Sequence, residues 1–211
     1  MTGALRLESV TLALPGRVLI DRLSLSVAPG QVAAVMGPSG CGKSSLLAWL
    51  TGTLPPPLAA TGAARLDGVD ITVLPPERRR IGILFQDDLL FPHLSVWENL
   101  AFGLPAAVRG RAERRRRAEA ALAEAELEGF ADRDPDSLSG GQRARVAVLR
   151  TLLAEPKALL LDEPFGKLDA SLRNKFRHFV FEHARRQRLP TLLVTHDAAD
   201  AEAADGPRVA L

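Results

Sequence analysis

Residues 32–50 read VAAVMGPSGCGKSSLLAWL and contain the segment that decides the fold. The apolar run Val32–Met36 is typical of a buried strand, and the stretch Ser44–Leu50 is typical of a helix. Between them, Gly37–Ser44 fits the pattern G-x-x-x-x-G-K-[ST] without a mismatch. A strand, a glycine-rich loop and a helix in this order predict a phosphate-binding loop in an α/β protein.

The residue types of this loop suit phosphate chemistry. Its glycines let the backbone turn N–H groups inward, toward phosphate oxygens. The following helix adds the positive end of its dipole, the Lys43 ammonium neutralises the β- and γ-phosphates, and the Ser44 hydroxyl can ligate Mg²⁺. A turn that binds no ligand is the alternative, which the complete motif disfavours. The predicted nucleotide-binding residues are Gly37, Pro38, Ser39, Gly40, Cys41, Gly42, Lys43 and Ser44.

A second motif follows much later in the chain, where Leu159–Pro164 reads LLLDEP. An apolar strand that ends in two carboxylates places them at the carboxyl edge of the sheet, where open α/β sheets bind ligands. Asp162 is predicted to hold Mg²⁺ through its water shell, and Glu163 to act as general base or to orient the attacking water. Alone, such a string is often only a strand end, but together with the loop it predicts phosphoryl chemistry.

The most specific string is LSGGQ at Leu138–Gln142, which precedes an apolar stretch. Ser139, Gly140 and Gly141 open a helix, so N–H groups and a helix dipole form a second anion site. One chain therefore carries two helix starts suited to phosphate, whereas a P-loop kinase or GTPase needs one. The Asn-Lys-x-Asp motif of GTPases is absent from the sequence.

Together these strings resemble the nucleotide-binding subunit of ABC transporters, and the resemblance covers essentially the whole chain. Gln86 in IGILFQ, Asp169 in GKLDASLR and His196 in LLVTHD agree with that family in order and spacing. The resemblance implies ATP hydrolysis in which Gln86 and His196 act with Glu163. It also implies a Mg²⁺ site of Ser44, Gln86 and Asp162, and ATP contacts from Ser139, Gly140, Gly141, Gln142 and Asp169.

The family implies a P-loop α/β core, with a mostly parallel sheet flanked by helices and an N-terminal antiparallel β layer. It also implies that residues 1–211 form one cassette, with an α-helical subdomain inserted at about 87–155. Because the sequence stops soon after the helical stretch that follows His196, a departure from the family, we expect no C-terminal regulatory domain. ATP would lie in a head-to-tail homodimer, between Gly37–Ser44 of one subunit and Ser139–Gln142 of the other. Helices are expected at Val96–Leu104, Arg111–Leu127 and Ala144–Leu153, and a proline-rich loop at Thr53–Ala60.

The stretch Leu74–Leu104 is similar to binding-protein-dependent importers of sulfate, iron, thiamine, polyamines and related solutes. That likeness implies permease subunits, a solute-binding protein and a peripheral place on the cytoplasmic side of the inner membrane. Leu90, Phe91 and Pro92 would suit the contact with the permease. Packing inside the helical subdomain is the competing interpretation, and the sequence does not decide between the two.

Composition supports a globular protein that binds no nucleic acid, with 46% hydrophobic residues and a net charge of +2 among interspersed charges. The basic run Arg111–Arg117 is expected to be the solvated face of a helix rather than an anion-binding patch. The single cysteine, Cys41, excludes an internal disulfide and indicates a reducing compartment. It is either a reactive thiol or, as favoured here, a small residue that faces the interior.

The sequence departs from the family at two further places, and two alternative functions stay open. The chain has no Tyr to stack on adenine, and the turn Leu14–Arg17 offers aliphatic surface or an arginine plane instead. Lys167 also changes the segment before Asp169, which keeps a nucleotide-binding module with little turnover as one alternative, although Glu163 and His196 oppose it. The other is a non-transport ABC ATPase, which would need a coiled-coil insertion or tandem cassettes, and the chain has neither.

Overall fold

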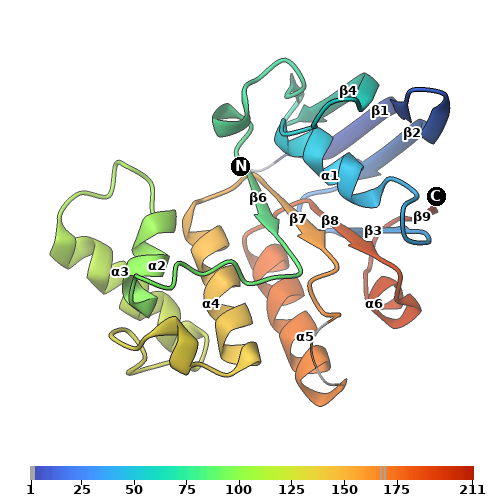
Figure 1. The fold of residues 1–211 in the computed structure, drawn as a ribbon. Coiled ribbons are helices and arrows are strands. Elements are labelled where there is room, and N and C mark those ends of the chain that lie inside the picture. Colours follow the sequence, from blue (N-terminus) through green and yellow to red (C-terminus); the bar gives the residue numbers. More distant parts are fainter. Residues whose placement is uncertain (1–2, 167, 169) are drawn as a thin grey trace. The chain divides into compact units, whose positions relative to one another are not determined.

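The computed structural model describes residues 3–166, 168 and 170–211 (Figure 1). Contacts divide the chain into two compact units. The first unit comprises the described residues of Met1–Ile83, Lys157–Glu163 and Phe179–Leu211. The second comprises those of Leu84–Pro156 and Pro164–His178.

An antiparallel sheet forms the N-terminal part of the first unit, with strand order β2-β1-β4-β5. Residues of β1 alternate between buried and exposed, as a strand with one covered face requires. The pairing of β1 with β2 shifts register at several points, and Arg22 has φ 46° there, so β2 is a bulged strand. The expected proline-rich loop also ends sooner, because β4 already begins at Ala59. The strands are β1 Leu5–Leu14, β2 Arg17–Val27, β4 Ala59–Leu66 and β5 Val69–Asp70.

A second sheet has strand order β6-β7-β8-β3-β9. Strands β7, β8, β3 and β9 run parallel, and β3, β7 and β8 are the continuous apolar runs of the sequence. The edge strand β9 was not predicted, since three residues are too few for a periodic pattern; it pairs with β3 near Val35. The strands are β3 Val32–Met36, β6 Ile81–Leu84, β7 Ala158–Asp162, β8 Thr191–Thr195 and β9 Arg208–Ala210.

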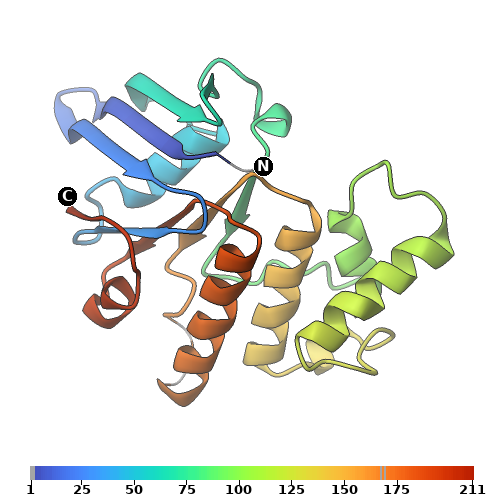
Figure 2. The same ribbon diagram turned by 180° about the vertical axis from the view of Figure 1, so that it is seen from behind.

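Helix α1, residues Lys43–Thr51, lies between the two sheets of the first unit (Figures 1 and 2). Its side chains Leu46, Leu47 and Leu50 are buried in one cluster with residues of both sheets. At its C-terminal end, the buried guanidinium of Arg79 donates to the carbonyls of Trp49 and Leu50, at 2.6 and 2.9 Å. The core of this unit therefore holds the helix that follows the phosphate-binding loop.

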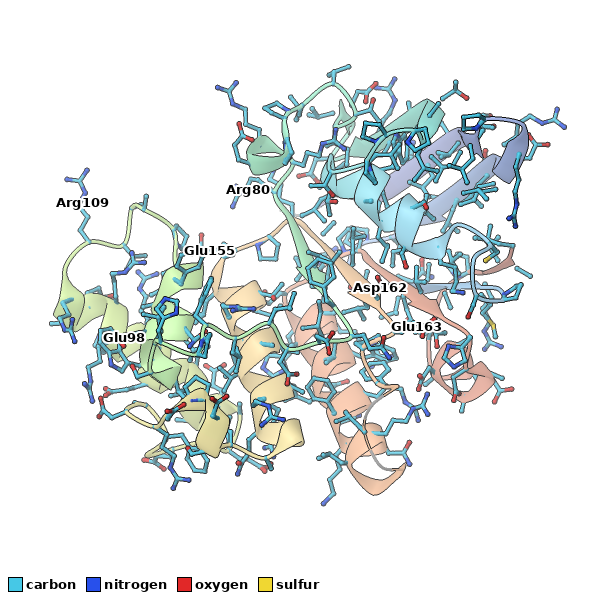
Figure 3. The ribbon with its side chains drawn as sticks, viewed as in Figure 1. Arg80, Glu98, Arg109, Glu155, Asp162 and Glu163 are labelled. Atoms are coloured by element: carbon cyan, nitrogen blue, oxygen red, sulfur yellow. The ribbon has the colours of Figure 1, made fainter. Side chains whose placement is uncertain are left out.

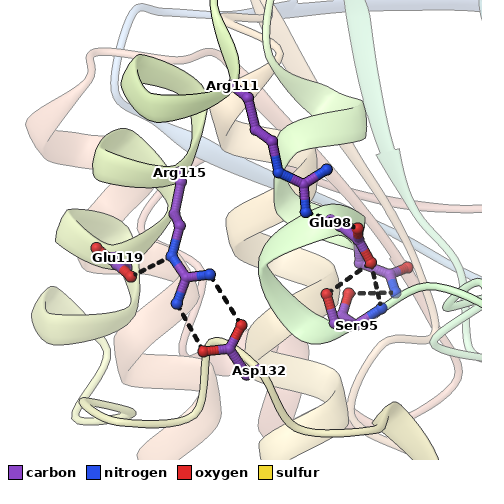
Figure 4. Close-up of polar contacts among 7 residues, drawn as sticks. Ser95, Glu98, Arg111, Arg115, Glu119 and Asp132 are labelled. Atoms are coloured by element: carbon purple, nitrogen blue, oxygen red, sulfur yellow. Dashed lines mark hydrogen bonds and ion pairs between the residues drawn. The ribbon is translucent and has the colours of Figure 1, made fainter.

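The second unit is helical. Helix α2 begins with a capping box, in which Ser95 and Glu98 bond each other's backbone N–H groups (Figure 4). The LSGGQ string opens helix α4, which we call the signature helix. This helix begins at Gly140, earlier than the Ala144 expected from its apolar residues, because Ser139 caps it. The helices are α1 Lys43–Thr51, α2 Val96–Gly103, α3 Arg111–Glu124, α4 Gly140–Leu153, α5 Ala170–Arg186 and α6 Ala198–Glu202, with 3₁₀ turns at Pro76–Arg78 and Pro135–Ser137.

The basic run Arg111–Arg117 lies in α3 and is engaged within its own unit. Arg115 bonds both carboxylate oxygens of Asp132, at 2.9 and 2.6 Å, and also Glu119 (Figure 4). The guanidiniums of Arg111 and Arg115 both lie over the ring of Trp97. The run is therefore a paired surface of the helix, as the sequence predicted. Across the part of the chain that is described, no helix is long and apolar enough to cross a membrane.

Candidate functional site

The predicted phosphate-binding loop joins β3 to α1, and its glycines are required by geometry. Gly40 and Gly42 have φ of 78° and 106°, in the left-handed region that side chains disfavour. A Cβ on Gly42 would also lie 3.1 Å from the Cβ of Leu19 and 3.2 Å from Cγ1 of Ile20. Cys41 is half-buried, with its thiol against the place a side chain at Gly37 would occupy. The loop therefore presents its backbone at the N-terminus of α1.

Lys43, the first residue of α1, holds its charge inside the loop. Its side chain is 6% exposed, and its Nζ donates to the carbonyls of Gly37 and Pro38, at 2.7 and 2.9 Å. The same Nζ lies 3.9 Å from Oε1 of Glu163. These contacts hold the ammonium at the loop, so little side-chain entropy remains to be lost on binding.

The two carboxylates of the second motif follow β7 at the carboxyl edge of the sheet (Figure 3). Burial raises the pKa of Asp162 above its usual value, although a hydrogen bond from Ser44 opposes that shift. Glu163 has φ 47°, and its N–H donates to the carbonyl of Val194 at 2.9 Å. This left-handed turn is the kind of backbone strain that clusters at functional sites.

Glu163 contacts two other predicted site residues through different oxygens. Its Oε2 lies 3.0 Å from Nδ1 of His196, and its Oε1 faces Lys43. Its side chain is 23% exposed and that of His196 is 62% exposed, so water can reach the pair. A carboxylate held between an ammonium and an imidazole is placed to accept a proton from water.

The oxygen ligands near the loop suit Mg²⁺ only in part. Ser44 supplies a hydroxyl and Asp162 a carboxylate, and the two side chains bond each other. Among the described residues, no group of three or more His, Cys, Asp or Glu could hold a metal by itself. Mg²⁺ usually binds through one or two carboxylates together with substrate phosphates. These residues therefore fit Mg²⁺ that arrives with a nucleotide.

We expect Asp162→Asn to raise the melting temperature of the ligand-free chain at pH 7. The raised pKa means that the folded state binds this proton more readily than the unfolded state does. The stability that the carboxyl contributes is present below its unfolded pKa and is lost as pH rises through the folded pKa. Asparagine keeps the shape without the charge. Thermal denaturation at pH 7 and at about pH 3, below the ordinary carboxyl pKa, measures the difference, which should shrink in acid.

The matched control is Asp21→Asn, which removes a carboxylate that is 63% exposed in β2 of the same unit. It should leave the melting temperature unchanged at both pH values, because a surface ion pair contributes little. A lower melting temperature for Asp162→Asn at pH 7 would contradict the burial argument.

In the second unit, Ser139–Gln142 of the LSGGQ string form the start of α4. Oγ of Ser139 accepts from the N–H of Gln142 at 3.3 Å, and Oε1 of Gln142 accepts from the N–H of Ser139 at 2.9 Å. A Cβ at Gly141 would overlap the side chain of Leu172, so a larger residue would fit there only if that leucine moved. The cap occupies two of the free N–H groups, and the turn of Gly140 and Gly141 presents its backbone at the helix start.

The predicted site residues are divided between the two units. The loop Gly37–Ser44, Asp162, Glu163 and His196 lie in the first unit, and Ser139–Gln142 lie in the second. Gln86 is exposed two residues beyond β6, also in the second unit. Asp169 and Lys167 lie outside the described residues.

The sequence did not single out Asn99, which organises the segment after Gln86. Its side chain is completely buried, and its Oδ1 accepts from the N–H of Phe91 at 2.8 Å. Its Nδ2 donates to the carbonyls of Phe91, Leu94 and Ser95, each at 3.1 Å. An asparagine in a helical stretch has no pattern that reveals such a role, because every partner lies outside α2.

Comparisons with known proteins agree with this geometry. The family model described as ABC transporter matches residues 20–166. The uncharacterized ABC transporter ATP-binding protein YnjD of Escherichia coli K12 is 49% identical over 196 residues, which cover 93% of this chain and 90% of that protein. The putrescine transport ATP-binding protein PotG of the same organism is 41% identical over 201 residues, which cover 95% of this chain and 52% of PotG. The chain thus spans about half the length of that relative.

Among solved structures, the chain is similar to the dimeric ATP-binding cassette MJ0796 bound to ADP and Pi. The TM-score is 0.81 with 30% sequence identity, and the match covers 98% of this chain and 94% of that one. The predicted fold class, a P-loop α/β core with an antiparallel β layer, is therefore confirmed. The chain belongs to the ABC transporter family, as an ATP-binding subunit of the kind that hydrolyses ATP to energise transport.

Proposed function

We propose that this chain hydrolyses ATP to drive the uptake of a small solute through a membrane permease. The observation that carries the proposal is the contact of Glu163 with both Lys43 and His196 at the end of β7. Glu163 takes a proton from the water that attacks the γ-phosphorus, the bond to the leaving oxygen of ADP breaks, and phosphate is released. His196 orients Glu163, and Lys43 neutralises charge on the β- and γ-phosphates.

The remaining assignments follow the same chemistry. The N–H groups of Gly37–Ser44 bind the phosphates. Ser44 and Asp162, together with Gln86, would hold Mg²⁺, which supplies charge neutralisation at the phosphates when it is bound. Gln86 also contacts the attacking water. The helices of the second unit support a helical subdomain at about 87–155.

A head-to-tail homodimer completes the proposed site. Ser139–Gln142 and Asp169 contact the ATP that is bound to the loop of the partner subunit. The dimer of MJ0796 supports this assembly. Because the charge of the γ-phosphate is shared by two separate sets of N–H groups, ATP closes the dimer and hydrolysis releases it.

The importer assignment rests on relatives such as PotG, a putrescine transport protein. The partners we propose are integral membrane permease subunits and a solute-binding protein, with no nucleic acid. The chain lies peripherally on the cytoplasmic side of the membrane. It contacts the permease through an apolar surface that includes Leu89 and Phe102 in the second unit. Leu89 and Phe102 are 57% and 67% exposed, and the ring of Phe102 packs on that of Phe91 with 4.7 Å between their centres, so apolar side chains gather in this region.

Co-expression with candidate permease subunits tests this proposal. We expect the permease to recruit the chain to membranes, and we expect docking to change the ATPase rate. Membrane flotation and phosphate release measure these two effects. If the chain stays off membranes with every neighbouring membrane protein and instead binds DNA ends or ribosomes, the non-transport alternative replaces the importer.

A further inference from the structure

Arg143 joins two segments of the second unit that the proposed function assigns to ATP. Its Nε lies 3.3 Å from Oδ2 of Asp88, two residues after Gln86. Its Nη1 donates at 2.9 Å to the carbonyl of Leu138, the residue before Ser139. One guanidinium therefore bridges the segment that follows Gln86 and the start of the signature helix.

Arg150 makes a second connection on the same face of α4. Arg150 lies seven positions after Arg143, which is close to two helical turns. Nη1 of Arg150 donates to the carbonyl of Leu89 at 2.8 Å, and Nη2 donates to the carbonyl of Asp88 at 3.1 Å. The guanidinium also lies over the ring of Phe91, with 5.4 Å to the ring centre. The segment 88–91 is thus bound to α4 at two levels.

The backbone of this segment depends on those contacts. Leu89 has φ 46°, a left-handed conformation that a leucine keeps only when its surroundings hold it. Arg150 donates to the carbonyl of Leu89 itself. The ion pair with Arg143 holds Asp88, the residue before Leu89. Loss of the Asp88 charge would remove one of the contacts that resist relaxation of this backbone.

We propose that Asp88 is a positioning residue that makes Gln86 and the signature helix start move as one body. The inference rests on the proposed function only for the roles of Gln86 and Ser139 toward ATP. A shift of Gln86 is then transmitted through Asp88 and Arg143 to the carbonyl of Leu138. The side chain of Asp88 is 28% exposed and that of Arg143 is 38% exposed. Water can therefore weaken this ion pair, so the two side chains can adjust during the ATPase cycle.

Hydrogen exchange in the isolated chain tests the link without ATP. Asp88→Asn should make the amides of Ser139, Gln142 and Arg143 exchange about threefold to fivefold faster, as expected for a partly exposed ion pair. Asp88→Glu should restore the slow exchange, because it keeps the charge. Asp132→Asn is the matched control; it removes an ion pair with Arg115 in the same unit and should leave those amides unchanged.

Steady-state kinetics test whether the link serves catalysis. Asp88→Asn should lower kcat for ATP by about fivefold to tenfold and leave KM within about twofold, since the loop that binds ATP is untouched. Asp88→Glu should recover most of kcat, and Asp132→Asn should match the wild type. A residue that only stabilised the fold would lower the melting temperature and the amount of active protein, with no such separation of kcat from KM.

The outcomes separate the link from the proposed function. Unchanged exchange at Ser139–Arg143 in Asp88→Asn would overturn the inference, whether or not the chain is an ATPase. Faster exchange with unchanged kcat would also overturn it, because the link would then have no part in turnover. A wild-type chain without ATP turnover would overturn the proposed function, while the exchange result would still decide whether the two segments are coupled.

Discussion

Glu163→Gln should lower ATP turnover by about 10²–10³-fold or more and should leave ATP binding intact. Glutamine has the shape of glutamate and can still contact His196, but its amide cannot take a proton from water. Hydrolysis would stop while the loop and Lys43 still bind the nucleotide. The variant should therefore accumulate an ATP-bound dimer. Phosphate release, nucleotide binding and size-exclusion chromatography with ATP measure the three effects.

Glu182→Gln is the control for this experiment. Glu182 lies in α5 within the first unit and pairs with Arg185 at 3.2 Å, away from the Glu163 contacts. This variant should hydrolyse ATP at the wild-type rate. Turnover near the wild-type level in Glu163→Gln would reject Glu163 as the catalytic base.

Charged residues at Leu89 and Phe102 should abolish recruitment by the permease. We expect Leu89→Asp combined with Phe102→Asp to weaken membrane association by about 100-fold or more. A charge forced into an apolar protein contact loses its hydration without gaining a partner. Both side chains are more than half exposed in the chain alone, so their replacement should spare the fold. Membrane flotation with the co-expressed permease measures recruitment, and ATP binding to the isolated variant verifies the fold.

Val73→Asp is the matched control, because Val73 is 78% exposed in the first unit, outside this surface. It should bind membranes like the wild type. Phe91 is a poor choice for this test. Its ring packs on Phe102 at 4.7 Å, and its backbone is bound by the buried Asn99. A charge there would report damage to the helical unit. Wild-type recruitment of the Leu89 and Phe102 double variant would show that the permease docks elsewhere.

Much of this protein could be predicted from local patterns in the sequence. The loop Gly37–Ser44, the strand that ends in Asp162 and the helix start at Ser139 each depend on neighbours in the chain. Backbone turns, apolar periodicity and helix caps act over a few residues, so short strings reveal them. A catalytic role for His196 beside Glu163 was implied only by the order of motifs in a known family, and their 3.0 Å contact comes from the structure.

Long-range packing determined the rest. The strand β9 exists because β3 offers it an open edge, and three residues contain no sign of that partner. The sequence did not decide whether Phe91 contacts the permease or packs inside the helical subdomain. Its contacts with Phe102 and Asn99 favour packing. The pairing of Asp88 with Arg143 spans 55 positions. Such contacts form only when the chain has folded, because burial and side-chain geometry depend on residues that are distant in sequence.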